Sequence, residues 1–304
     1  MVIALILTSA LFAAMQNLCM RRSVDTGGGA NLYVPIQLFI SALIATLLNP
    51  VSTGDYGINI STVVLGVLMG SMMGLLMWSL GKSLKFGSPA LTFAVVNSCS
   101  VLPAVLMAFV FGKGLGHPYH WWNGMGSLVV VIGIFWSSWA AISCTDKKRW
   151  ALFMASGAAA FILFSAMLQW KVLLETHGGT HWLLPVKISA ENNQFLMPII
   201  FLCAALMQLL GLRGQPLHFS KETAIYGLLG GICNGSSLFF MMMSTSKAVG
   251  IENAILFPLF SIAVIQICNL WGRALYQEKI QWTPQTLCIG GLVLGSVYWP
   301  QIFS

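Results

Sequence analysis

The sequence predicts an all-α polytopic membrane protein with ten transmembrane helices, arranged as two inverted five-helix repeats. Three observations lead to this prediction. The chain is 57% hydrophobic and only 8% charged, whereas a soluble domain has roughly 25% charged residues. Its charged residues leave ten long uncharged runs between them. A pattern of glycines in the first half of the chain also returns in the second half.

Each transmembrane helix is predicted from an uncharged run of about 20 residues or more, the length needed to cross the hydrocarbon core. The runs cover residues 1–20, 26–54, 56–81, 86–112, 114–145, 150–170, 192–212, 223–246, 253–272 and 280–304. None comfortably holds two spans. The first run is not expected to be a cleaved signal, because Arg21 and Arg22 follow its apolar core instead of preceding it. We therefore predict an integral, multi-pass protein of a cell's inner or plasma membrane.

Glycines recur at every fourth position in two of these runs, which places them on one helix face. They are Gly66, Gly70 and Gly74 in the third run, and Gly227, Gly231 and Gly235 in the eighth run, 161 residues later. In lipid, such a face lets the backbone of another helix approach closely. We therefore predict that both sets are helix-packing sites.

Other segments are matched between the two halves in the same order. Pro35-Ile36 is matched by Pro198-Ile199, and Trp136 by Trp299, each 163 residues later. These matches divide the chain into a first five-helix repeat, residues 1–145, and a second, residues 150–304. Because five is odd, the second repeat must enter the membrane from the opposite side. This inverted arrangement is typical of carriers that alternate access around a central site.

The basic residues are distributed unevenly between the loops. Of the 15 Lys and Arg residues, 11 lie in odd-numbered loops and 4 in even-numbered loops. Basic loops usually face the cytoplasm, so this distribution predicts that both termini lie outside. It also accounts for the net charge of +7 without a nucleic-acid partner, and none is predicted.

Several of these features together resemble the ten-helix drug/metabolite transporter superfamily, of the EamA-like kind. They are the glycines of the third run, the Lys85-Phe-Gly87 break, the long fourth run, the short loop after it and the Gly-rich fifth run. The resemblance extends over essentially the whole chain. It implies a carrier of amino acids, sugars, nucleotide-linked metabolites or drugs. Many relatives are described with cytoplasmic termini, whereas the loop charges here predict external ones.

Polar and aromatic side chains within the spans are the candidate substrate-binding residues, because polar groups in a membrane usually face the bundle interior. They are Asn17, Gln169, Asn97, Asn234, Gln16, Trp78, Phe239 and Gln266. The duplication makes Asn17 equivalent to Gln169, and Trp78 equivalent to Phe239. The alternative for each amide is a hydrogen bond that only holds two helices together. The alternative for the aromatic pair is ordinary packing.

The sequence favours a transporter over other classes of membrane protein. No Asp or Glu lies in the core of a span, which argues against a proton-coupled pump for cationic drugs. We expect a facilitator, exporter or exchanger of a small polar metabolite, such as an amino acid or sugar, that uses alternating access around a central cavity. The protein is expected to act as a monomer or homodimer in the lipid bilayer.

Two alternatives to this function stay open. An anionic or nucleotide-linked metabolite could be exchanged through basic residues at the cavity mouths, namely Lys85, Lys247 and Arg273. The chain could also be a non-transporting membrane scaffold or an enzyme. No catalytic residue, cofactor or metal site is predicted. His177 and His181 have a spacing that resembles a metal site, but no carboxylate or cysteine cluster accompanies them.

Overall fold

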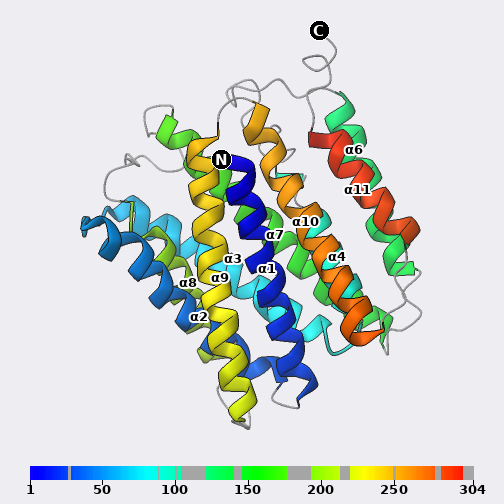
Figure 1. The fold of residues 1–304 in the computed structure, drawn as a ribbon, viewed down its shortest axis with the longest axis horizontal. Coiled ribbons are helices and arrows are strands. Elements are labelled where there is room, and N and C mark those ends of the chain that lie inside the picture. Colours follow the sequence, from blue (N-terminus) through cyan, green and yellow to red (C-terminus); the bar gives the residue numbers. More distant parts are fainter. Residues whose placement is uncertain are drawn as a thin grey trace.

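The computed structural model describes residues 1–26, 29–87, 89–99, 102–103, 121–139, 146–176, 193–212, 220–248, 251–277 and 282–296. Within these ranges the regular structure is helical (Figure 1). The helices are α1 (Val2–Asp25), α2 (Gly29–Thr46), the π-helix η1 (Leu47–Val51), α3 (Ile60–Ser83), α4 (Pro89–Ser98), α6 (Trp121–Trp139), α7 (Lys147–Thr176), α8 (Leu196–Gly211), α9 (Lys221–Lys247), α10 (Ile251–Tyr276) and α11 (Trp282–Ser296). Each of the ten uncharged runs contributes helical residues.

Six helical segments in the described part of the chain are long and apolar enough to cross a membrane. They are Val2–Asp25, Leu32–Val51, Ile60–Ser83, Lys147–Leu168, Lys221–Lys247 and Leu256–Tyr276. Shorter apolar helices are formed by Gly124–Gly133 and Leu196–Gly211. Large apolar side chains such as Leu163 and Leu206 are exposed on the outside of the bundle, as expected where a helix faces lipid. The all-helical prediction is confirmed for the described residues, and these six segments have the length and apolar composition expected of a multi-pass membrane protein.

Two long helices begin at the residues that the sequence favours for helix starts. The Asn59 side chain accepts a hydrogen bond from the Ser61 amide at 3.1 Å, at the start of α3. The Ser220 hydroxyl accepts one from the Thr223 amide at 3.0 Å, at the start of α9. These caps satisfy amide groups that the first turn of a helix leaves without partners.

The helices form a layered bundle. The pair α6–α11 stands at one edge and the pair α2–α8 at the opposite edge (Figure 1). Between them, α1 packs on α9 and α10, while α7 packs on α3 and α4. The edge helices also contact the centre, α2 through α9 and α8 through α3. These contacts come in matched pairs when α1, α2, α3, α4 and α6 are set against α7 to α11 in the same order. The contact of α1 with α9 then matches that of α7 with α3, α1 with α10 matches α7 with α4, and α2 with α9 matches α8 with α3.

Helix ends that carry basic residues lie at one end of the bundle. Val34 near the start of α2, Lys82 near the end of α3 and Gly211 at the end of α8 line one cavity. Phe86, just after α3, stacks on Phe153 near the start of α7 with ring centroids 6.0 Å apart. These are helix ends that flank odd-numbered loops, and among the described residues they lie close together.

Candidate functional site

Buried polar side chains line the contact between α1 and α9. Ser9 Oγ donates a hydrogen bond to the Ser237 carbonyl at 2.7 Å, and Ser237 Oγ donates one to the Ser9 carbonyl at 2.9 Å. Asn234 lies three residues before Ser237 and so on the same side of α9. It is buried, and its Nδ2 has no hydrogen-bond partner among the described residues. This contact therefore combines a satisfied serine pair with an unsatisfied amide.

The adjacent residues Gln16 and Asn17 face two different neighbours of α1. The carbonyl of Gln16 accepts a hydrogen bond from Tyr33 of α2 at 3.2 Å, while its side-chain Nε2 has no partner within the described ranges. Asn17 Nδ2 lies 3.7 Å from the Cys268 sulfur of α10, a weak hydrogen bond. The predicted amides of α1 are thus buried where α1 meets α2 and α10.

The other predicted amides have different surroundings. Asn97 is buried in α4, where its Nδ2 donates to the Phe93 carbonyl of the same helix at 2.8 Å. Gln266 is exposed on α10. Gln169 belongs to α7, but its side chain lies outside the described residues. Three predicted residues, Gln16, Asn17 and Asn234, therefore lie around α1 and α9, and Asn97 bonds within its own helix.

The predicted aromatic pair is divided between two environments. Trp78 of α3 is 42% exposed, and its ring meets Phe153 of α7 edge to face with centroids 5.4 Å apart. Phe239 of α9 is half-buried and meets the ring of Phe240, at a centroid distance of 5.6 Å. Trp78 thus meets an aromatic ring of another helix, whereas Phe239 meets one of its own helix, although the predicted duplication makes the two residues equivalent.

Gln37 of α2 is a buried amide that sequence reasoning left out of the candidate site. It is fully buried, and neither Nε2 nor Oε1 has a partner among the described residues. Its position in the middle of an apolar run could have identified it from the sequence as a candidate buried amide. By contrast, Asn269 of α10 and Gln285 of α11 hydrogen-bond to each other through their side chains. That pair is satisfied and holds two helices together.

Both glycine sets lie against another helix, and the partner belongs to the other half of the chain. A Cβ added at Gly70 would lie 2.7 Å from Cys203 Cβ of α8, and also 2.7 Å from the Ile200 carbonyl. A Cβ added at Gly231 would lie 2.5 Å from Ile40 Cβ of α2. Along the same interfaces, Gly66 and Gly74 face Ile199 and Met207, while Gly227 and Gly235 face Ile36 and Ile44.

A cavity of about 270 Å³ lies between α3 and α8. Two predicted residues, Gly74 and Trp78, line it, and so do Lys82 and Gln208. Gln208 Nε2 donates a hydrogen bond to the Gly74 carbonyl at 2.5 Å. Lys82 and Gln208 were not among the predicted site residues. The predicted duplication makes Met243 equivalent to Lys82 and Ala45 equivalent to Gln208. Neither polar residue is repeated, so the predicted duplication gave no signal for them.

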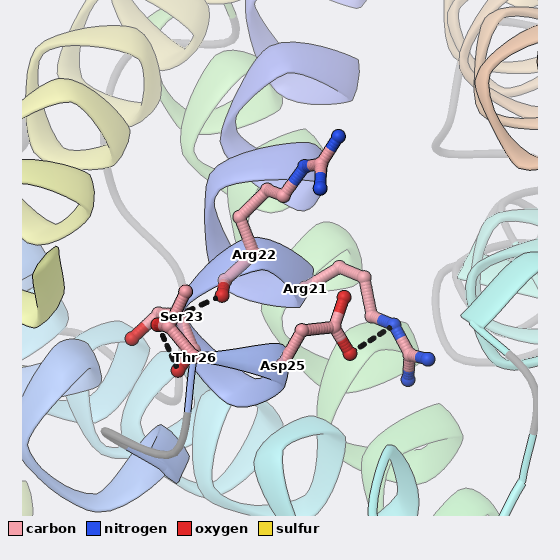
Figure 2. Close-up of polar contacts among 5 residues, drawn as sticks. All are labelled: Arg21, Arg22, Ser23, Asp25 and Thr26. Carbon is pink, nitrogen blue, oxygen red and sulfur yellow. Dashed lines mark hydrogen bonds and ion pairs between the residues drawn. The ribbon is translucent and has the colours of Figure 1, made fainter. Parts of the chain in front are cut away.

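A second polar cluster lies at the end of α1, where Arg21 forms an ion pair with Asp25 at 3.0 Å (Figure 2). Arg22 points in a different direction, and its carbonyl accepts a hydrogen bond from the Thr26 hydroxyl at 3.1 Å. The guanidinium carbons of Arg21 and Arg22 lie 5.3 and 5.2 Å from the ring centroid of Tyr276 on α10. Cation–π contacts therefore connect the ends of α1 and α10.

His177 and His181, for which no metal site is predicted, lie outside the described residues. A comparison of the chain with protein-family models and with curated protein sequences gave no match. The resemblance to the drug/metabolite transporter superfamily therefore stays a prediction from the sequence.

Proposed function

We propose that this protein is a secondary transporter of a small polar metabolite, with ten membrane helices built as two inverted five-helix repeats. In this proposal the substrate binds between the halves, at buried amides around α1 and α9. The protein alternates between states open to the two sides of the membrane. The resemblance to the drug/metabolite transporter superfamily supports the same class of function.

The reciprocal contact of the glycine sets is the observation that carries the proposal. Gly66 of the first half meets Ile199 of the second, and Gly227 of the second meets Ile36 of the first. Ile36 and Ile199 are themselves 163 residues apart and are matched by the duplication. Contacts exchanged in this way are expected of two repeats related by a two-fold axis. Close glycine contacts also allow two packed helices to move as one body.

The unsatisfied amides support a binding role between these helices. Within the described ranges, Gln16, Gln37 and Asn234 each bury a side-chain donor that has no partner. Leaving such a donor unpaired costs about 1–3 kcal/mol. A polar substrate that supplies both donors and acceptors would satisfy these groups when bound. Asn17 and Asn97, whose hydrogen bonds are a weak one to sulfur and one within the same helix, are available to take part after a rearrangement.

Metabolite profiling of cells with and without the protein would identify the transported compound. Purified protein in liposomes would then be tested for uptake of that compound in labelled form. We expect Gln16→Ala, Asn17→Ala and Asn234→Ala each to weaken transport by roughly 1–3 kcal/mol, equivalent to about 5- to 150-fold. Melting temperatures close to wild type would show that the loss comes from binding.

Ser9→Ala provides the matched control, because Ser9 is buried in the same interface but is fully engaged with Ser237. Its replacement should lower the melting temperature and leave uptake per folded molecule nearly unchanged. The proposed site would be wrong if all three amide variants transported normally. A chain that changed no metabolite pool and moved no compound across liposomes would instead be a scaffold or an enzyme.

A further inference from the structure

We propose that the cavity between α3 and α8 binds an anionic phospholipid, with an acyl chain inside the cavity and the phosphate group on Lys82. This site is separate from the amides proposed to bind a transported substrate. The inference therefore does not depend on transport, and it can be tested without measuring transport.

The shape of the cavity suits a chain with a polar end. It follows α3 from Gly74 to Lys82, a length of eight residues or about 12 Å along a helix. Most of its lining is apolar and comes from Leu75, Met77, Val34, Met207 and Leu212. The polar side chain of Gln208 is already engaged with the Gly74 carbonyl. The deep part of the cavity therefore has few polar groups that a ligand would need to hydrogen-bond.

The charge of the cavity is concentrated at its outer end. Lys82 is half-buried there, and Lys85 is exposed three residues further on. Among the described residues, Arg21 forms an ion pair with Asp25 and Arg149 forms one with Asp146, but none is formed by Lys82. The Lys82 ammonium group is thus without an acidic partner there. An anionic headgroup would complement it, because basic pockets between membrane helices bind such groups.

The surroundings of the cavity favour a lipid over a soluble anion. Leu206, Leu209 and Leu210 of α8 are 53%, 50% and 57% exposed and continue the surface beside the cavity. In a membrane this surface faces acyl chains. Trp78, half exposed one helix turn before Lys82, is the type of residue that is enriched at the level of lipid headgroups. A lipid can therefore enter sideways with its tail already in an apolar environment.

The test is native mass spectrometry of the full chain, released from nanodiscs that contain equal amounts of phosphatidylglycerol and phosphatidylcholine with identical acyl chains. We expect the wild-type protein to retain phosphatidylglycerol in preference to phosphatidylcholine. Lys82→Gln should reduce the retained phosphatidylglycerol about five-fold, the effect of one basic group near a lipid surface. Lys85→Gln is the matched control, because Lys85 lies at the same helix end but does not line the cavity, and it should reduce retention much less than Lys82→Gln does.

A second variant tests the apolar part of the cavity. A Cβ at Gly211 would meet no described atom within 4 Å, so Gly211→Leu should fill the cavity without disturbing the fold and displace the lipid. Gly290 of α11 is also open, but it lies away from the cavity, and Gly290→Leu should retain lipid as the wild type does.

Three results would overturn the proposal. One is equal phosphatidylglycerol retention by the wild-type, Lys82→Gln and Gly211→Leu proteins. Another is displacement of phosphatidylglycerol by millimolar glycerol phosphate, which would identify a soluble anion as the ligand. The third is a dimer that Gly211→Leu converts to a monomer without loss of lipid, which would make this surface an interface between two copies of the chain.

Discussion

Ser9 of α1 and Ser237 of α9 each donate a hydrogen bond to the main-chain carbonyl of the other, at 2.7 and 2.9 Å. Both side chains are buried, so each alanine substitution leaves a carbonyl with one hydrogen bond fewer. We expect Ser9→Ala and Ser237→Ala each to destabilise the protein by about 0.6–1.7 kcal/mol, the range for hydrogen bonds between membrane helices. The double variant should lose less than the sum, because the hydroxyls also lie 3.2 Å apart.

Thermal melting of the four purified proteins in one detergent would measure this coupling. Ser246→Ala is a suitable control, because the Ser246 hydroxyl bonds only to the Met243 carbonyl of its own helix among the described residues and is exposed. A loss of stability in the double variant equal to the sum of the two single losses would contradict a shared interaction between the serines.

Gly231 of α9 and Gly74 of α3 should differ in their tolerance of a single methyl group. At Gly231, an added Cβ would lie 2.7 Å from the Gln37 carbonyl, which is main chain and cannot move aside. At Gly74, the nearest atom would be the flexible Met207 sulfur at 3.3 Å. We therefore expect Gly231→Ala to lower the melting temperature and the yield of folded protein, and Gly74→Ala to have a much smaller effect.

The control for this prediction is Gly290→Ala, since Gly290 lies in a helix with no described atom near the new Cβ. Alanine favours helix formation over glycine by up to about 1 kcal/mol, so this variant should be neutral or stabilised. Equal melting temperatures for the Gly231 and Gly290 variants would show that the contact between α2 and α9 is not close.

Tyr276 should contribute to stability through the face of its ring. Arg21 and Arg22 both lie near the ring centroid, and each contact is worth about 0.5–1 kcal/mol at an exposed site. Tyr276→Phe keeps the ring and should melt close to the wild type, whereas Tyr276→Leu should melt at a lower temperature. The difference should shrink in high salt if the contacts are electrostatic. Identical melting curves for the two variants would argue against them.

The orientation of the chain in the membrane can be tested with reporters. The excess of basic residues in odd-numbered loops, 11 against 4, predicts that both termini are external. A C-terminal reporter that is active only in the cytoplasm should therefore be inactive. The same reporter fused after Lys85, in an odd-numbered loop, should be active. The opposite pattern of reporter activity would show that both termini are cytoplasmic, and it would not change the prediction of the helices.

The sequence alone was sufficient to predict the helical class of the chain and the positions of its apolar helices. Both depend on local properties. A run such as residues 60–83 is helical, and it is long and apolar enough to span a membrane, where a helical backbone satisfies its own hydrogen bonds. The basic residues mark helix ends because a charge in the hydrocarbon core is costly.

The partner of each glycine face was decided only by the tertiary structure. The spacing of Gly66, Gly70 and Gly74 predicts a surface that a helix can approach, but any helix could occupy it. The structure places α8 there through Ile199 and Cys203, because the arrangement of all the helices determines which surface is available.

The surroundings of the polar residues were also decided by tertiary structure. Asn97 and Asn234 are amides in similar apolar runs, yet Asn97 bonds to the Phe93 carbonyl of its own helix. Asn234 Nδ2 has no partner within the described ranges. The cavity beside Lys82 likewise depends on where α3 and α8 separate. A sequence specifies which polar groups a side chain carries. The groups that can hydrogen-bond to it often belong to helices distant in the chain, and only the packing of those helices brings the partners within reach.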